Sequence, residues 1–315
     1  MTYHILHITT PNVSLYTDKG FFCCKFDDDS ENRLPIDDIR AIIIATHQVT
    51  FTNSCLAKLL ENNIVILHCN NSYKPIGWSI SFDRVVRTKA FYNQIAQNKD
   101  FENKLWKTIL KSKVTNQANN LKLIGQNPEN IFKLINKPLI SEANIAKQYW
   151  NAYFIALEKE QKREHKNAEN FENICLNYGY AVFQSLLYRS IIIHGLIPNL
   201  GIHHEEKYNS APLVYDLIEP FRAFIDFYLY KFKINEGGSF KREDLKSWNK
   251  YLAFCMKNYR LNAKGLNYKI IDFIDIYIEE IVNSFIKFDI SKLILPDISA
   301  QYLHIDKHRN REYEE

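Results

Sequence analysis

The stretch Ile39–Ala45 reads IRAIIIA, a short and almost continuous apolar run. A run of this length is typical of a buried strand rather than of a helix. A second run of the same kind follows at Ile64–His68 (IVILH). Between the two, Thr52–Glu61 has the leucine spacing of a short helix, with Thr52 or Asn53 as its N-cap. This part of the chain is therefore predicted to be built around strands.

The residues before this stretch continue the β pattern toward the N-terminus. Short apolar or alternating runs are present at Tyr3–Thr9, Val13–Tyr16 and Phe21–Phe26. The sequence Asp18–Gly20 (DKG) between two of them predicts a turn. After the second apolar stretch, Pro75–Gly77 (PIG) is predicted to be a loop.

From about Phe82 onward the apolar residues recur with helical spacing. Between residues 85 and 121 several groups of apolar residues have this spacing. Longer helices are then predicted at Glu142–Lys162, Phe171–Gly195, Leu213–Lys233, Lys241–Tyr259 and Leu266–Lys287. The polar segment 160–173 is expected to be an exposed connector. The predicted fold class is α+β, with a β-rich domain over residues 1–80, a larger helical domain over 81–300 and a charged tail over 301–315.

The composition is that of a globular protein. The 315 residues are 46% hydrophobic and 14% aromatic, which excludes a disordered chain. The six cysteines form no C-x-x-C pair and lie mostly in apolar runs, so we expect buried thiols in a reducing compartment. No signal peptide or membrane-spanning run is evident, which predicts a protein without a membrane partner.

Basic charge is concentrated in two stretches, although the formal net charge is only +4. Residues 84–122 hold nine basic and two acidic residues, and residues 231–264 hold nine and three. Clustered basic charge is typical of nucleic-acid binding, whereas for either stretch alone a solvated helix surface is the preferred interpretation. The candidates for contact with DNA are Arg84, Arg87, Lys241, Arg242 and Lys246.

One motif contains side chains that could bind a metal ion or take part in a reaction. Gly201–His204 (GIHH) precedes Asn209 and the segment Asp216–Arg222 (DLIEPFR). On a helix, Asp216 and Glu219 would share one face, with Arg222 one turn further along. Imidazole and carboxylate groups suit a divalent metal ion, which can polarise a phosphoryl oxygen and orient a nucleophile. The pattern thus favours phosphodiester chemistry.

Each of these groups also has a structural explanation. The two histidines could be ordinary hydrogen-bonded loop residues, and the two carboxylates could be surface charges or partners of a helix dipole. Glu142 lies in the first turn of a helix that Ser141 can cap, so it could be a dipole-matching surface residue. Tyr149 is expected to be a packing residue. Gly179, inside a helical pattern, indicates a close approach of backbone or ligand.

Taken together, these segments closely resemble the CRISPR-associated protein one family, in the form found in type II systems, which have a single RNA-guided effector. The resemblance is carried by LNYGY at Leu176–Tyr180, by GLIP with LGIHH at residues 195–204, by Asn209, and by DLIEPFR followed by Asp226. The SEAN…YWNA block around Glu142 and the Trp106, Lys113 and Gln117 positions resemble two further family segments. The sequence FRAFID differs from the family wording FRPFVD, and many relatives have Asp in place of Glu219.

The resemblance implies a β-sandwich-like N-terminal domain and an all-α catalytic domain. It implies that Glu142, His204 and Glu219 hold Mg²⁺ or Mn²⁺, with Asp216 as a supporting carboxylate. The implied reaction joins the 3′-hydroxyl ends of captured DNA fragments to the CRISPR repeat, in a prokaryotic cytoplasm. The implied partners are double-stranded DNA, a second copy of the chain, CRISPR-associated protein two, the RNA-guided effector nuclease and other adaptation proteins.

Two other functional classes remain open from the sequence. The same site could belong to a metal-dependent nuclease that processes branched or damaged DNA, and such an enzyme would cut fragments without joining them to a repeat. A non-catalytic DNA-binding scaffold is the second alternative. The presence of Glu142, His204 and Glu219 together argues against a scaffold, because binding alone does not require all three.

Overall fold

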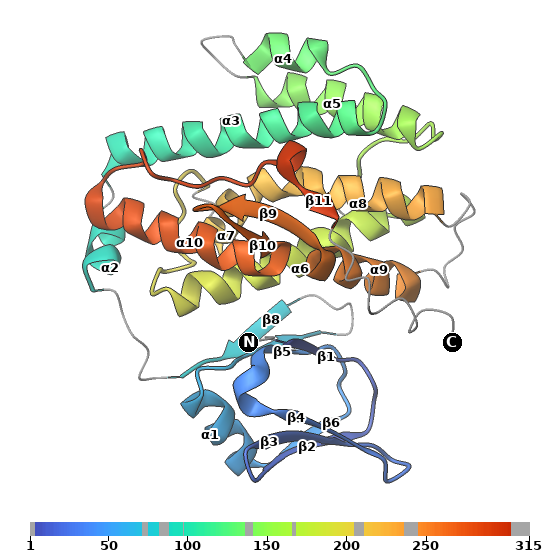
Figure 1. The fold of residues 1–315 in the computed structure, drawn as a ribbon, viewed down its shortest axis with the longest axis vertical. Coiled ribbons are helices and arrows are strands. Elements are labelled where there is room, and N and C mark those ends of the chain that lie inside the picture. The colour runs from blue at the N-terminus through green and yellow to red at the C-terminus, as the bar shows by residue number, and fades with distance from the viewer. Residues whose placement is uncertain are drawn as a thin grey trace. The chain divides into compact units, whose positions relative to one another are not determined.

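The computed structural model describes residues 4–70, 75–81, 88–96, 98–135, 141–165, 168–204, 211–235 and 245–303. The chain divides into two compact units, Met1–Val86 and Arg87–Glu315 (Figure 1). The first contains two β-sheets and the second is mostly helical, which confirms the predicted α+β class.

Two four-stranded sheets form the N-terminal unit. The first has the order β1-β5-β7-β8, in which β1, β5 and β7 are parallel and β8 is antiparallel. The second has the order β4-β3-β2-β6. The strands are β1 (His4–Ile8), β2 (Val13–Asp18), β3 (Phe21–Lys25), β4 (Glu31–Pro35), β5 (Ile39–Ile44), β6 (Val49–Phe51), β7 (Val65–Cys69) and β8 (Pro75–Ser79). The short 3₁₀ helix η1 (Ile36–Asp38) leads into β5.

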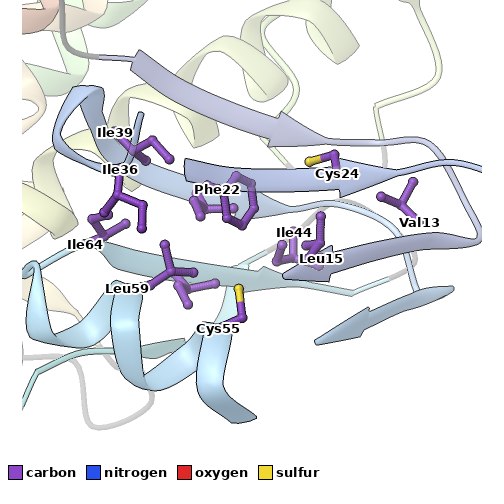
Figure 2. Packing of buried hydrophobic residues seen from close by; sticks show 12 residues of the cluster. Val13, Leu15, Phe22, Cys24, Ile36, Ile39, Ile44, Cys55, Leu59 and Ile64 are labelled. Atoms are coloured by element: carbon purple, nitrogen blue, oxygen red, sulfur yellow. The ribbon is translucent and has the colours of Figure 1, made fainter. Parts of the chain in front are cut away.

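The core of this unit lies between the two sheets and the helix α1 (Asn53–Glu61) (Figure 2). Alternate residues of the apolar stretch, Ile42 and Ile44, belong to this core, while Ile43 lies in a second cluster with Leu67 and Cys69. The strand β5 is therefore buried on both faces, as its unbroken apolar run predicts. The Thr52 side chain accepts a hydrogen bond from the Cys55 amide at 3.1 Å, which confirms Thr52 as the N-cap of α1.

The turn at Asp18–Gly20 joins β2 to β3 as expected, with Lys19 and Gly20 at positive φ. The loop predicted at Pro75–Gly77 is wrong, because these residues begin β8. Pro75 is the first residue of an edge strand, one of the few positions in a sheet where proline is found.

The helical unit is organised around α3, which packs against α4, α5, α8 and the 3₁₀ turn η2 (Figure 1). Its helices are α2 (Thr88–Ile95), α3 (Lys99–Leu123), α4 (Glu129–Ile135), α5 (Glu142–Ala156), α6 (Phe171–Ile193), α7 (Pro212–Leu217), α8 (Arg222–Asn235), α9 (Leu245–Asn258) and α10 (Ile270–Lys287), with the 3₁₀ turns η2 (Glu219–Phe221) and η4 (Ile298–Ala300). No helix among the described residues is both long and apolar enough to cross a membrane.

Two predicted helices are shorter than expected. The helix predicted over Leu213–Lys233 is divided into α7, η2 and α8, and Pro220 lies at the break. The proline has no N–H for the helical ladder and clashes with the preceding turn. The helix predicted over Glu142–Lys162 ends at Ala156, and Glu158 then adopts a positive φ of 57°.

The predicted start of the last helix is also wrong. Residues 259–269 form a hairpin of β9 (Tyr259–Ala263) and β10 (Leu266–Lys269), and β11 (Tyr302–Leu303) joins them in a three-stranded sheet. Lys264 and Gly265, both at positive φ, make the turn. The helical unit thus carries a small sheet as an addition to its helices.

Candidate functional site

Glu219 lies at the centre of the candidate site, in the turn η2 that Pro220 creates between α7 and α8. Its carboxylate is buried between two cations. Oε2 is 2.7 Å from Nζ of Lys113, and Oε1 accepts a hydrogen bond of 2.9 Å from Nε of Arg222. Burial opposes ionisation of this group, but the neighbouring Arg222 and Lys113 charges outweigh it and lower the pKa of Glu219 to about 2.

Glu142 approaches the same lysine from another element. It is the first residue of α5, and its Oε1 accepts a hydrogen bond of 2.8 Å from Nζ of Lys113. Ser141 precedes it at the N-cap position, although its side chain makes no capping hydrogen bond. The carboxylates of Glu142 and Glu219 therefore converge on one ammonium group supplied by α3.

The two histidines lie in a loop that is folded around Asp216. The fully buried Asp216 carboxylate accepts hydrogen bonds from the backbone amides of Ile202, His203 and His204, at 2.6, 3.1 and 3.3 Å. It also lies 2.6 Å from Nδ1 of the His204 ring. In the neutral ring with the proton on Nδ1, Nδ1 donates to Asp216 and the other ring nitrogen is an acceptor. The structure thus places Asp216 against His204, and its role as a supporting carboxylate stays a prediction.

A close approach of backbone holds this loop in place. A Cβ at Gly201 would come within 2.3 Å of the His204 carbonyl oxygen and 2.9 Å of Pro212 Cβ, so only glycine fits. His203 stacks on Trp106 of α3 with ring centroids 4.3 Å apart, and His204 meets the same indole edge-on. Of the pair, the exposed His203 ring stacks on Trp106, and the His204 ring is the one that contacts Asp216.

The charges around His204 favour its protonated form. The hydrogen bond from the ring to Asp216 raises the pKa of His204 above its ordinary value, burial opposes this shift, and the negative charges of Glu219 and Glu142 add to it. The same negative field would favour a bound cation near the imidazole.

The site offers oxygen and nitrogen donors of the kind that a divalent metal ion takes. No group of three His, Cys, Asp or Glu side chains within the described ranges is arranged to hold a metal ion. Two carboxylates nevertheless converge on a cation, the Lys113 ammonium. Oε2 of Glu219 is buried and, in the described part of the chain, accepts no hydrogen bond beyond its ion pair with Lys113. Carboxylate oxygens and a neutral imidazole are the ligands that Mg²⁺ and Mn²⁺ take, so the residues fit such an ion.

Tyr149 belongs to a buried network rather than to the reacting groups. Its hydroxyl donates to Asp226 at 2.5 Å and accepts from Asn120 at 2.7 Å, while Tyr180 donates to the other Asp226 oxygen. Burial raises the pKa of Tyr149 well above its ordinary value, which disfavours a phenolate nucleophile. Gly179 does have a close neighbour, but it is a side chain rather than the predicted backbone or ligand, since a Cβ there would lie 2.5 Å from the Ile225 side chain.

Most of the basic residues predicted to contact DNA fall outside the described ranges: Arg84, Arg87, Lys241 and Arg242, together with the motif residue Asn209. Lys246 is described and is exposed on α9. Residue reasoning missed the part that Lys113 plays in the site. Its signal was available, because Trp106 and Lys113 are seven residues apart and so share one face of α3.

The connector 160–165 is also more ordered than its composition predicts. Arg163 donates hydrogen bonds to Asn173 at 2.9 Å and to Asn177 at 2.6 Å on α6. Its guanidinium also covers the rings of Trp150 and Tyr180. Backbone groups of Lys162 and Glu164 also bond to Asn173 and Asn177, so the segment is fixed against α6 by several contacts and against α5 by Arg163.

Comparison with known proteins agrees with this architecture. CRISPR-associated endonuclease Cas1 of Neisseria meningitidis serogroup C (strain 8013) is 26% identical over 272 residues, covering 84% of this chain and 87% of that protein. Casposase bound to integration product has a similar fold, with a TM-score of 0.78 at 17% identity over 99% of this chain and 98% of that chain. The Cas6-RT-Cas1–Cas2 complex contains a chain with a TM-score of 0.73 at 17% identity, matching 94% of this chain and 36% of that chain.

A family model gives the assignment. The model described as CRISPR associated protein Cas1 matches residues 6–248, a range that includes Glu142, His204, Asp216 and Glu219. This match covers most of both units. The chain therefore belongs to the CRISPR associated protein Cas1 family.

Proposed function

We propose that this chain is a metal-dependent DNA integrase of CRISPR adaptation, which joins the 3′-hydroxyl ends of captured fragments to the CRISPR repeat. The observation that carries the proposal is the convergence of Glu142 and Glu219 on one cation, beside an imidazole held by Asp216. The names of the relatives support it, since one is an endonuclease and another protein of this fold is a casposase bound to its integration product.

Glu142, His204 and Glu219 would hold the ion, which is Mg²⁺ or Mn²⁺. When bound, such an ion lowers the pKa of a hydroxyl nucleophile and neutralises charge on the attacked phosphate. The chain's own residues prepare the ligands. Arg222 keeps Glu219 ionised, because it donates to Oε1 and leaves Oε2 facing Lys113. Asp216 fixes the orientation of the His204 ring by accepting from Nδ1, which directs the other nitrogen away from Asp216.

Holding the DNA is assigned to basic side chains outside this cluster. Lys104, Lys107 and Lys111 are exposed on α3, the helix that also supplies Lys113, and Lys246 is exposed on α9. Arg84, Arg87, Lys241 and Arg242 complete the proposed set. These charges would neutralise backbone phosphates without reading the bases.

The proposed assembly is a homodimer that works with Cas2. The solved Cas6-RT-Cas1–Cas2 complex motivates this partner, and the CRISPR repeat together with the captured fragment provides the two DNA substrates. The RNA-guided effector nuclease and other adaptation proteins are proposed as further partners.

A strand-joining assay tests the function. A labelled duplex with free 3′-hydroxyl ends is incubated with a repeat-containing duplex, Cas2 and Mn²⁺, and the longer joined strand is measured. Glu142→Gln, His204→Ala and Glu219→Gln are each expected to abolish joining. Glutamine is preferred at position 219, because alanine would leave Lys113 and Arg222 without their shared partner.

The neighbouring variant His203→Ala is the matched control, since it removes the ring stacked on Trp106 and leaves the His204–Asp216 contact. We expect it to reduce joining only partly. Full joining by Glu219→Gln would contradict the ligand assignment. Cutting without joining by the wild-type protein would identify the branched-DNA nuclease instead, and binding without either reaction would identify a scaffold.

A further inference from the structure

Lys113 is placed differently from the other lysines of α3. Its side chain is 19% exposed, whereas Lys107 and Lys111 on the same helix are exposed to solvent. Its Nζ lies 2.8 Å from Glu142 Oε1 and 2.7 Å from Glu219 Oε2. One ammonium thus bridges two carboxylates that come from separate elements, α5 and η2.

These two oxygens are also the atoms through which a divalent ion would be held in the proposed site. An ion bound between them would have to lie where the ammonium now lies, because both cations need oxygen contacts of less than 3 Å. The charges of the cluster agree with this placement. Lys113 and Arg222 balance Glu142 and Glu219, so an added divalent ion would find no uncompensated negative charge on these four residues.

Of the two cations, Lys113 is the one that can leave. Arg222 is held by its hydrogen bond to Glu219 and by packing of its guanidinium over the Tyr180 ring, 4.8 Å from the centroid. A guanidinium is planar and fixed by such contacts, whereas the lysine ammonium is a point charge on a flexible four-carbon stem. The displaced ammonium would remain next to the site, where the anion supplied by a DNA substrate is a phosphate oxygen.

We propose that Lys113 is an exchangeable internal cation, which joins Glu142 to Glu219 in the metal-free protein and moves to a DNA phosphate when a divalent ion enters. The proposal rests on the proposed function. Metal and DNA then bind cooperatively. The ion displaces the Lys113 ammonium from the two carboxylates and so frees it to bind a phosphate, and a phosphate that binds the ammonium leaves the carboxylates free for the ion. Such a coupling is reciprocal, so Mn²⁺ must strengthen DNA binding by the same factor as DNA strengthens Mn²⁺ binding.

The test measures Mn²⁺ affinity rather than turnover. Mn²⁺ binding to the full-length protein is followed by electron paramagnetic resonance, with and without a short duplex DNA, for the wild type, Lys113→Met and the control Lys111→Met. Lys111 is exposed on the same helix, two residues away. Without DNA, Lys113→Met is expected to bind Mn²⁺ at least about fivefold more tightly than the wild type, and adding DNA should tighten Mn²⁺ binding by a smaller factor in Lys113→Met than in the wild type.

Further variants and a melting measurement control for misfolding of Lys113→Met and for Mn²⁺ bound outside the site. Lys113→Arg keeps the charge in a planar, two-pronged form, so it should fold and bind Mn²⁺ more weakly than the wild type without DNA. Thermal melting of Lys113→Met should show a larger stabilisation by Mn²⁺ than the wild type shows. Glu219→Gln reports any Mn²⁺ bound outside the site.

Three results would each overturn the inference. They are equal or weaker Mn²⁺ binding by Lys113→Met, Mn²⁺ binding by Lys113→Arg as tight as that of the wild type, and a coupling to DNA as large in Lys113→Met as in the wild type. If the wild type joins strands but the Lys113 variants bind Mn²⁺ with the same affinity as the wild type, only the proposed role of Lys113 is wrong. If the wild type binds no Mn²⁺ even with DNA, both this inference and the proposed function fail.

Discussion

The carboxylate of Asp216 determines the conformation of the histidine loop. Three successive backbone amides and one imidazole donate to its two oxygens, and none of its surface is exposed. A buried carboxylate is stable only when its lone pairs are satisfied in this way. The residue therefore acts on His204 twice, through the backbone and through the ring.

Gly201 is predicted to be essential for this arrangement. Gly201→Ala places a methyl group 2.3 Å from the His204 carbonyl oxygen, which forces the loop away from Asp216. We expect a loss of about 2 kcal/mol in the free energy of unfolding, together with loss of strand joining. Urea denaturation and the joining assay provide the measurements. Gly77→Ala, where a Cβ meets nothing within 4 Å, is the control and should be close to neutral.

The charge of Glu219 predicts a pH dependence of stability. Its pKa is lowered from 4.5 to about 2 in the folded protein, so its ionised form contributes stability that is fully present above pH 4.5 and is lost as the pH falls toward 2. That contribution is roughly 3 kcal/mol. In metal-free denaturation, Glu219→Gln should be less stable than the wild type at pH 6, and the difference should shrink below pH 4.5. A stability difference for Glu219→Gln that stays constant with pH would contradict the prediction.

At the scale of elements, α3 connects the parts of the site. Lys113 reaches η2 and α5, and three residues later the buried Asn116 donates to the carbonyls of Pro220 and Pro296, both at 2.8 Å. Asn116 also accepts from the Ile298 amide at 3.1 Å. One side chain thus ties the turn that carries Glu219 to α3 and to the segment before η4.

Replacing Asn116 tests this connection. Asn116→Ala leaves two buried carbonyls without this donor and one amide without its acceptor, so we expect a loss of about 2 kcal/mol or more. Strand joining should fall further than stability alone explains, because the turn of Glu219 loosens. Chemical denaturation measures the loss of stability. Joining rates of the wild type and Asn116→Ala, compared at a temperature where both are folded, measure the effect on activity. The exposed Asn103→Ala on the same helix is the matched control.

Elements with local signals could be predicted from the sequence, and those set by tertiary contacts could not. The strand β5 and the cap of α1 at Thr52 follow from a short apolar run and a hydroxyl before a leucine pattern. The break at Pro220 interrupts a segment whose apolar spacing is continuous, so helical periodicity hides it. The hairpin at Lys264 and Gly265 was missed for the same reason.

In the candidate site, too, some residues could be predicted from the sequence and others could not. Family resemblance identified Glu142, His204 and Glu219 as candidates, and whether they bind metal stays a prediction. Lys113 is one lysine among several on a basic helix, and its spacing does not tell which carboxylates it will meet. That information exists only once α5 and η2 are packed on α3.

At the scale of the whole molecule, the N-terminal unit is predicted to mediate a homodimer. Ile76 and Trp78 lie on one face of the edge strand β8, and Ile76 is 67% exposed. Ile76→Lys is expected to convert dimers to monomers at micromolar concentration, as measured by light scattering. Ile155→Lys, at a position 66% exposed in the helical unit, is the control and should leave the dimer intact. A wild-type protein that is monomeric would refute the prediction.

The basic stretches predict how DNA binding responds to salt. Replacing Arg84, Arg87, Lys241, Arg242 and Lys246 with Glu should weaken duplex binding and flatten the dependence of affinity on salt, by about 0.9 in logarithmic slope for each phosphate that the protein no longer neutralises. Fluorescence anisotropy over a salt series measures both quantities. An unchanged slope would mean that these charges are solvated surface, and Lys58→Glu, outside both stretches, should leave the slope as it is.

The cysteines give each unit its own chemical probe of opening. All six are free and buried, with Cys23, Cys24, Cys55 and Cys69 in the first unit and Cys175 and Cys255 in the second. A thiol reagent can reach them only during excursions that expose the interior, so the rate of alkylation at each cysteine reports how often its surroundings open. Peptide mass spectrometry after timed alkylation would therefore rank the opening free energies of the two units in one unmodified sample. Added manganese or DNA should slow the reaction at whichever unit it stabilises.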